Sequence, residues 1–180
     1  ILRAPMKRAS NLNIHSFVKL PPPGELKSSH PAPEASVETA LEGRETIRRI
    51  LSGEDQRLLA VVGPCSIHDT SAAMEYAKRL VKLREEVKDR VYLVMRVYFE
   101  KPRTRLGWRG LILDPHLDGS YDIETGLIRA RALLRDITSL GLPAGSEMLD
   151  PIVPQYIDEF VSWASIGART TESQTHREMA

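Results

Sequence analysis

Three cationic side chains lie close together where a run of apolar residues ends. Arg96 interrupts the apolar run Leu93–Val97, and Lys101 and Arg103 follow it on either side of Pro102. Such a run is typical of a buried strand, so the cations stand where a strand leaves the core for a loop stiffened by proline. Fixed guanidinium and ammonium groups in that place bind phosphates or carboxylates. A solvated surface turn without a ligand is the competing interpretation.

Three further polar residues stand near the ends of other apolar runs. Cys65 follows the run Leu58–Val62, while Glu147 and Arg169 belong to two later strand-like segments. A lone cysteine is usually a small hydrophobic residue of the core, and a metal ligand or nucleophile is the alternative interpretation. A buried arginine without a counter-charge is costly. We therefore expect Arg96 and Arg169 to face either Glu147 or an anionic ligand.

The composition describes an ordinary soluble protein and excludes several classes. A length of 180 residues predicts one domain, and a net charge of +1 gives no basis for a broad nucleic-acid surface. No apolar run approaches the ~18 residues of a membrane span. The single cysteine excludes an internal disulfide and is typical of a protein of the reducing cytoplasm.

The first 33 residues differ in composition from the rest of the chain. Residues 1–33 are polar and rich in proline, which favours either a flexible arm or an arm that packs on a partner subunit. A loop over residues 98–120 is too long for a plain connection and suggests a functional role. The remaining patterns predict strands at 58–62, 91–97, 144–149 and 166–169, and helices at 34–52, 71–89, 122–140 and 151–164.

This alternation of strands and helices predicts an α/β protein with parallel strands and crossover helices. A doubly wound sheet and a TIM barrel both fit the pattern. In either fold, chemistry gathers at the carboxyl ends of the strands. Cys65, Arg96, Glu147 and Arg169 all lie at or near such ends, so we expect them to meet on one side of the molecule.

Several ordered stretches resemble one enzyme family, the class I 3-deoxy-D-arabino-heptulosonate 7-phosphate (DAHP) synthases. The resemblance extends from about residue 16 to the last residue and includes Leu41–Arg44 ahead of the first strand. The motifs are long and specific. They are Gly63–Asp69, Met95–Thr104, Gly107–Trp108, Asp114–Asp118 and Gly167–Gln174.

The resemblance implies a TIM (β/α)8 barrel. Residues 34–180 would cover about its first four βα units, and residues 1–33 would form the N-terminal extension. The family chain is about twice as long as this one, and a closed barrel needs about 250 residues. Because the chain starts at Ile1 and stops soon after a strand-like segment, we expect a fragment that is inactive by itself.

The activity implied is a metal-dependent 3-deoxy-7-phosphoheptulonate synthase, the first step of the shikimate pathway to aromatic amino acids. Phosphoenolpyruvate and erythrose 4-phosphate condense with water to DAHP and phosphate. A divalent metal, whether Mn, Fe, Co or Zn, would polarise the aldehyde. Cys65 matches one metal ligand, and the family's other ligands are not matched in this chain.

The resemblance also assigns the other site residues. Positions that match the phosphoenolpyruvate site are Arg96, Lys101 and Arg169. The segment Lys101, Pro102, Arg103 and Thr104 matches the site for erythrose 4-phosphate. Lys101 and Glu147 match catalytic positions, the glutamate near the reacting water or phosphate.

The partners implied are other copies of the chain, as a dimer or tetramer, and an inhibitory aromatic amino acid. The N-terminal arm and Pro151–Gln155 match segments near the inhibitor site, which favours an intersubunit role for the arm. Nucleic acid and membrane are not expected. Two alternatives remain: a truncated product that only binds phosphate-bearing ligands or parent subunits, and an aldolase-type barrel with a Schiff-base lysine. The predicted strands contain no lysine, which counts against the second.

Overall fold

The computed structural model describes residues 10–14 and 16–179. The helices are α1 (Pro23–Ser29), α2 (Glu34–Leu51), α3 (Thr70–Val87), α4 (Ile123–Ser139), α5 (Pro154–Ile157) and α6 (Gln174–Met179), with 3-10 turns η1 (Asp158–Phe160) and η2 (Ala168–Thr170). The strands are β1 (Leu58–Val62), β2 (Val91–Arg96), β3 (Ala144–Met148) and β4 (Val161–Ile166). None of the helices in the described residues is long and apolar enough to cross a membrane.

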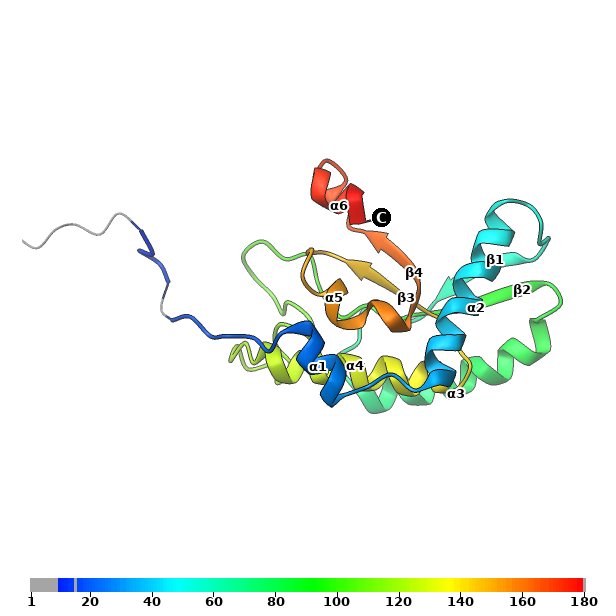
Figure 1. The fold of residues 1–180 in the computed structure, drawn as a ribbon, viewed down its shortest axis with the longest axis horizontal. Coiled ribbons are helices and arrows are strands. Elements are labelled where there is room, and N and C mark those ends of the chain that lie inside the picture. Colours follow the sequence, from blue (N-terminus) through cyan, green and yellow to red (C-terminus); the bar gives the residue numbers. More distant parts are fainter. Residues whose placement is uncertain (1–9, 15, 180) are drawn as a thin grey trace, which may run out of the picture.

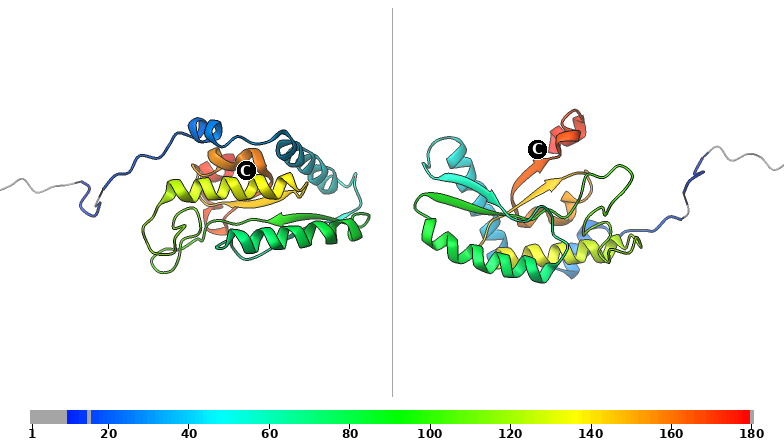
Figure 2. Two further views of the ribbon diagram at one scale, coloured as in Figure 1. Left: turned by 90° about the horizontal axis from the view of Figure 1, so that it is seen from below. Right: turned by 180° about the vertical axis from the view of Figure 1, so that it is seen from behind.

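The four strands form one parallel sheet in the order β1-β2-β3-β4, which confirms the predicted α/β class. The long helices α3 and α4 run along one face of this sheet (Figures 1 and 2). Consecutive strands are neighbours, so the carboxyl ends of all four strands lie along the same edge. This arrangement brings the loops that follow successive strands side by side.

Alternation along β2 separates the core from the face that carries the functional side chains. Leu93, Met95 and Val97 are buried in the hydrophobic core with side chains of α3 and α4. Because successive side chains of a strand point to opposite faces, Arg96 points away from the helices. Arg96 pairs with Gly145 in the parallel register. Glu147, two residues further on, therefore shares the face of Arg96.

Helix α2 packs against the amino end of β4 and lies near Pro143, just ahead of β3. A side chain at Gly43 would collide with Ser162 at the start of β4, so glycine permits the close approach. Arg44 then donates hydrogen bonds to the Val161 carbonyl at 2.9 Å and the Asp158 carbonyl at 2.6 Å. These contacts leave the opposite, carboxyl ends of the strands free of α2.

The prediction for residues 151–169 is wrong. A helix was expected at 151–164 and a strand at 166–169, but helical structure ends at Phe160 and β4 occupies Val161–Ile166. The reason is strand pairing: Val161 lies opposite Ala144, and the ladder continues to Ile166 opposite Met148. Residues 168–170 form a 3-10 turn, and α6 was not predicted.

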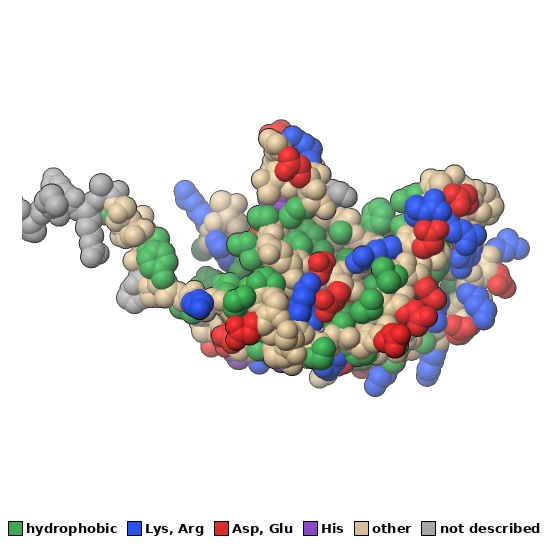
Figure 3. Space-filling view, in the orientation of Figure 1, with side chains coloured by type: hydrophobic (Ala, Val, Ile, Leu, Met, Phe, Trp, Pro, Cys, Tyr) green, Lys and Arg blue, Asp and Glu red, His purple; other side chains and the backbone are tan. Residues whose placement is uncertain are grey.

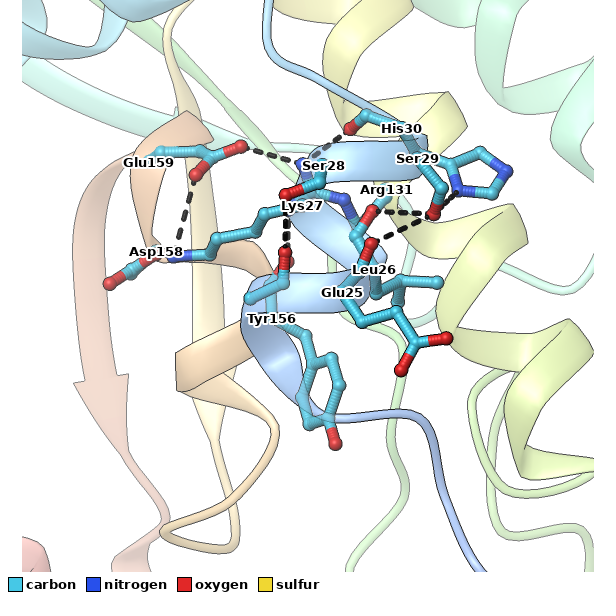
Figure 4. A network of polar contacts seen from close by, with 11 residues as sticks. Glu25, Leu26, Lys27, Ser28, Ser29, His30, Arg131, Tyr156, Asp158 and Glu159 are labelled. Atoms are coloured by element: carbon cyan, nitrogen blue, oxygen red, sulfur yellow. Dashed lines mark hydrogen bonds and ion pairs between the residues drawn. The ribbon is translucent and has the colours of Figure 1, made fainter.

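The expectation of irregular structure over 1–33 is wrong for Pro23–Ser29, which forms α1. Proline at the first helical position favours this start, and Leu26 is buried against the core. Lys27 makes ion pairs with Asp158 at 2.7 Å and Glu159 at 3.4 Å (Figure 4). Residues 1–9 lie outside the described residues.

A buried arginine of α4 completes the attachment of α1. The Arg131 side chain is 1% exposed and donates hydrogen bonds to the carbonyl oxygens of His30, at 2.6 Å, and Tyr156. It also pairs with Glu159 at 2.6 Å (Figure 4). The Tyr156 hydroxyl in turn donates to the carbonyl of Pro21 at 2.8 Å. Helix α1 is therefore held to α4 and α5 by polar contacts as well as by apolar packing.

Candidate functional site

Arg96 ends β2 and lies against the loop that leaves β1. Its guanidinium stacks over the Tyr98 ring at 3.9 Å and donates to the Cys65 carbonyl at 3.3 Å. A side chain at Gly63 would come within 2.6 Å of the Arg96 carbonyl, so glycine lets the two strand ends approach. Among the described residues, the buried Arg96 Nε has no hydrogen-bond partner. The guanidinium thus keeps donor capacity for a ligand.

Cys65 and Lys101 are in contact. The Lys101 ammonium lies 2.8 Å from the Cys65 sulfur. This hydrogen bond lowers the pKa of the Cys65 thiol, and the positive charges of Lys101, Arg96 and Arg103 lower it further. Since the thiol is exposed, the interpretation of Cys65 as a core hydrophobic residue is wrong. Its surroundings instead favour the thiolate, the form that binds metals and reacts as a nucleophile.

The described residues do not complete a metal site around this thiol. No group of three or more His, Cys, Asp and Glu side chains within residues 10–14 and 16–179 could hold a metal ion. Cys65 by itself can supply one ligand.

The loop after β2 is folded back on itself. The Lys101 amide donates to the Arg109 carbonyl at 2.9 Å, and Glu100 forms an antiparallel bridge with Gly110. Gly110 has φ of 110°, and a side chain there would collide with the Phe99 carbonyl, so glycine is required. The bridge closes residues 101–109 into a compact loop that presents its cations together.

This loop, the end of β3 and the turn after β4 enclose a cavity of ≈ 430 Å³. Arg169 reaches the Pro102 carbonyl at 3.5 Å, which joins the last strand end to the basic loop. Cys65 and Arg96 do not line the cavity, but Cys65 contacts it through Lys101. The predicted site residues that line it are Lys101, Pro102, Arg103, Thr104, Glu147 and Arg169.

A larger cavity of ≈ 480 Å³ lies elsewhere, between α3 and α4. It is lined by residues of the two helices such as Glu75 and Asp136. The chemistry-bearing residues identified from the sequence do not contribute to it. We therefore regard the cavity at the strand ends as the candidate site.

Three charged residues of the cavity were missed in the sequence: Glu100, Arg109 and Asp150. Glu100 is 6% exposed. Burial raises its pKa to about 8, and the nearby carboxylates of Asp150 and then Glu147 add to the effect. Asp150 itself accepts hydrogen bonds from the amides that follow it in the chain, at 2.6 and 2.9 Å. A carboxylate directly after the apolar segment Val97–Phe99 was the available signal for Glu100.

The cavity is therefore lined by two chemically different kinds of side chain. Lysine and arginine side chains come from the basic loop and from Arg169, and carboxyl groups come from Glu100, Glu147 and Asp150. Cations in fixed positions bind phosphate and carboxylate groups. Carboxyl groups in the same cavity can accept or hold a proton. Such a cavity suits a small, highly anionic ligand that undergoes proton transfer.

Comparisons with known proteins identify one family. Residues 32–180 match the family model described as the DAHP synthetase I family. The chain is 56% identical over 170 residues to the Phe-sensitive phospho-2-dehydro-3-deoxyheptonate aldolase of Escherichia coli (strain K12), covering 94% of this chain and 49% of the relative. It is 53% identical over 171 residues to the Tyr-sensitive protein of that strain, covering 95% and 48%.

A Trp-sensitive relative from Enterobacter agglomerans is 52% identical over 175 residues, covering 97% of this chain and 50% of the relative. Among solved structures, the phospho-2-dehydro-3-deoxyheptonate aldolase of Francisella tularensis SCHU S4 superposes with a TM-score of 0.90 at 49% identity. That match covers 93% of this chain and 49% of the other. The chain spans about half the length of the relatives it matches.

Proposed function

We propose a function from one premise: this chain belongs to the DAHP synthetase I family. The proposed role is the substrate-binding half of a 3-deoxy-7-phosphoheptulonate synthase. That enzyme condenses phosphoenolpyruvate and erythrose 4-phosphate with water to DAHP and inorganic phosphate. The names of the relatives, all phospho-2-dehydro-3-deoxyheptonate aldolases, support this activity.

The observation that carries the proposal is the meeting of cations from two separate strand ends around one cavity. Lys101 and Arg103 come from the loop after β2, and Arg169 comes from the turn after β4. Arg96 lies beside them and touches the loop after β1. Phosphoenolpyruvate carries a phosphate and a carboxylate, so it needs several such groups at once. We assign Arg96, Lys101 and Arg169 to its binding.

The second substrate is assigned to the basic loop. Lys101, Pro102, Arg103 and Thr104 form one edge of the cavity, and their backbone is held by the bridge at the base of the loop. An arginine and a threonine hydroxyl can hold the phosphate of erythrose 4-phosphate. With both substrates in one cavity, the residues place the C3 carbon of phosphoenolpyruvate against the aldehyde carbon, which is a proximity contribution.

Lys101 and Glu147 are the proposed catalytic residues. The Lys101 ammonium lies between the two substrate sites and neutralises charge on both during attack. After the carbon–carbon bond forms, water adds at C2 and the phosphate leaves with cleavage of the C–O bond. Glu147 points from β3 to the same face as Arg96, where its carboxylate can accept a proton from that water.

Cys65 is the proposed contribution of the described residues to a divalent metal. The exposed thiol with its lowered pKa fits a metal ligand, although the described residues do not complete a ligand set. When bound, such an ion polarises the aldehyde carbonyl. The exposed thiol also fits a reducing compartment, so we propose the cytoplasm.

The proposed parent fold is a TIM barrel. Four parallel strands in sequential order, with α3 and α4 on one face, are what the first half of an eight-stranded barrel contains. Residues 34–180 would form this half-barrel. The carboxyl-end position of the cavity is the position of active sites in such barrels.

The proposals for regulation and assembly rest on the relatives' names and on the segment that precedes α1. The relatives are named Phe-, Tyr- and Trp-sensitive, so we propose inhibition by an aromatic amino acid. Residues 16–20 extend away from the body of the molecule (Figure 1) and expose Phe17 and Val18. Apolar side chains in such a segment can pack on another subunit of a dimer or tetramer. Acidic and basic side chains are interspersed over the face drawn in Figure 3, so we propose neither nucleic acid nor membrane as a partner of that face.

Two measurements test the proposal on this chain. Erythrose 4-phosphate, titrated into the chain and followed by 31P NMR, should bind, and Arg103→Ala should weaken binding at least about tenfold. Arg135→Ala, on the outer helix α4, is the matched control and should bind normally. An assay of DAHP formation by the 180-residue chain should detect no turnover. Turnover by this chain would show that the described residues already hold the complete machinery.

A further inference from the structure

Glu100 is a buried carboxyl group without a cationic partner in a cavity lined by cations. Its side chain lines the cavity and is 6% exposed. Lys101, Arg103, Arg109 and Arg169 line the same cavity, yet none of them, and no other described residue, makes an ion pair with Glu100. The Lys101 ammonium instead donates one hydrogen bond to the Cys65 sulfur. An ionised Glu100 would therefore be a buried charge without compensation, which is costly.

The groups that face Glu100 are themselves acids. Asp150 lies close enough for a hydrogen bond between the two carboxyl groups, and the Glu147 charge acts on Glu100 as well. Asp150 also accepts hydrogen bonds from the two backbone amides of Ile152 and Val153. A bound metal ion does not offset the repulsion among these carboxyl groups, because the described residues contain no group of side chains that could hold one. A proton held by Glu100 relieves this repulsion.

We propose that Glu100 is a further ligand-binding residue of the cavity, a neutral carboxyl group that keeps its proton when a phosphate ester binds. A protonated carboxyl is a hydrogen-bond donor, whereas an ionised one only accepts. A fully ionised phosphate or carboxylate also only accepts, so the neutral acid can bond to it and the carboxylate would repel it. The inference rests on the proposed function, because it assigns a role toward the same anionic substrate.

The consequence is a proton linked to binding. The pKa of Glu100, raised to about 8 by burial and by its acidic neighbours, places the loss of this proton just above neutral pH. A phosphate ester is fully ionised well below that, since its second pKa is about 6. The affinity for a phosphate ester should therefore be nearly constant around pH 7. Above about pH 8 it should decrease with pH, with a slope that approaches tenfold per pH unit. Cys65 also titrates, with a lowered pKa, so it must be removed from the comparison.

The experiment is isothermal titration of phosphoenolpyruvate into the 180-residue chain at about pH 7, 8 and 9, with a Cys65→Ser background throughout. With Glu100 present, affinity should fall roughly tenfold between pH 7 and 9. Glu100→Gln, which stays neutral and keeps a donor, should bind as the parent does at pH 7 and should lose less than about threefold by pH 9. Glu172→Gln, at an exposed site, is the control and should follow the parent.

A second variant guards against a local change in structure at position 100. Asp150→Asn removes the acidic neighbour whose charge and hydrogen bond help Glu100 to retain its proton. The fall in affinity should therefore begin at a lower pH than in the parent.

The outcomes separate the two proposals. A Glu100→Gln chain that loses affinity with pH as steeply as the parent overturns the inference and leaves the proposed function standing. So does an Asp150→Asn chain with an unchanged profile. Absence of phosphoenolpyruvate binding to the folded parent chain at pH 7 overturns the proposed function, and the inference with it.

Discussion

Replacing Glu100 with glutamine should stabilise the protein above about pH 5, by an amount that grows up to about pH 8. The pKa of Glu100 is raised in the folded state, from its usual 4.5 to about 8. Between these values the unfolded chain has lost the proton and the folded chain retains it. The stability contributed by this group is therefore complete below pH 4.5 and is lost as the pH rises through about 8. Glutamine does not titrate, so the variant escapes that loss.

The size of the effect follows from the same two values. Each pKa unit corresponds to about 1.36 kcal/mol, so the difference between 4.5 and about 8 gives an upper bound of ~5 kcal/mol at and above pH 8. At pH 7 the same relation gives at most ~3 kcal/mol. For a chain of this size, ~3 kcal/mol corresponds to roughly 6–12 °C in the melting temperature. Near pH 5 the two proteins should differ by less than ~1 kcal/mol.

Urea unfolding at pH 5, 7 and 9, followed by far-ultraviolet circular dichroism, measures this difference directly. Glu172→Gln, which changes an exposed glutamate, should show no such pH-dependent gain. A Glu100→Gln difference that is constant across the three pH values would refute the reasoning, because it would show that Glu100 titrates alike in the folded and unfolded chains.

Three further substitutions test other parts of the account. Arg131→Met should lower the free energy of unfolding by about 3 kcal/mol because a buried ion pair and two hydrogen bonds are lost. Arg135→Met, at an exposed ion pair, should lower it by less than about 1 kcal/mol. Equal losses of stability in thermal denaturation would contradict the role of the Arg131 contacts. Gly126→Ala should destabilise by about 1–3 kcal/mol because its side chain would collide with a loop carbonyl oxygen, and a neutral result in urea unfolding would exclude that contact. Lys101→Met should raise the pKa of the Cys65 thiol, because the hydrogen bond from Lys101 is the main reason that this pKa is lowered. The variant should therefore react more slowly with iodoacetamide near pH 7. An unchanged rate would show that Lys101 does not influence the thiol.

The strands with continuous apolar runs were predictable from sequence, and β4 was not. Leu58–Val62 and the run through Met95 can be buried on both faces, so their patterns are recognisable without knowledge of neighbours. Val161–Ile166 mixes serine and alanine with larger residues, and its pattern is compatible with a helix. Its strand state depends on the pairing of Val161 with Ala144, a contact distant in sequence. Local patterns do not contain that information.

Helix α1 was missed for a related reason. Its seven residues are too short for helical periodicity, and prolines around it favour irregular structure. What holds the segment is tertiary: Leu26 in the core, Lys27 on Asp158 and Glu159, and the carbonyl of His30 on Arg131. Packing overrides local propensity in such cases.

The candidate site was predicted better on its cationic side than on its acidic side. Cations that follow apolar runs are visible in a sequence, and parallel topology brings strand ends together, so the meeting of Lys101, Arg103 and Arg169 could be expected. Asp150 enters the cavity from the loop after β3, beyond the strand-like segment. The proximity of Asp150 to Glu100 depends on how that loop folds. A carboxyl group's pKa likewise depends on burial, which the sequence does not display.

The central claim is that the strand ends of this chain form a binding site for phosphoenolpyruvate. Isothermal titration of phosphoenolpyruvate into the 180-residue chain at about pH 7 tests it most directly, with Arg169→Ala beside Arg135→Ala as the matched surface control. We predict saturable binding with one site per chain, weakened at least about tenfold by Arg169→Ala and unaffected by Arg135→Ala. Equal binding by the parent and Arg169→Ala, or no binding to the folded parent, would contradict the account.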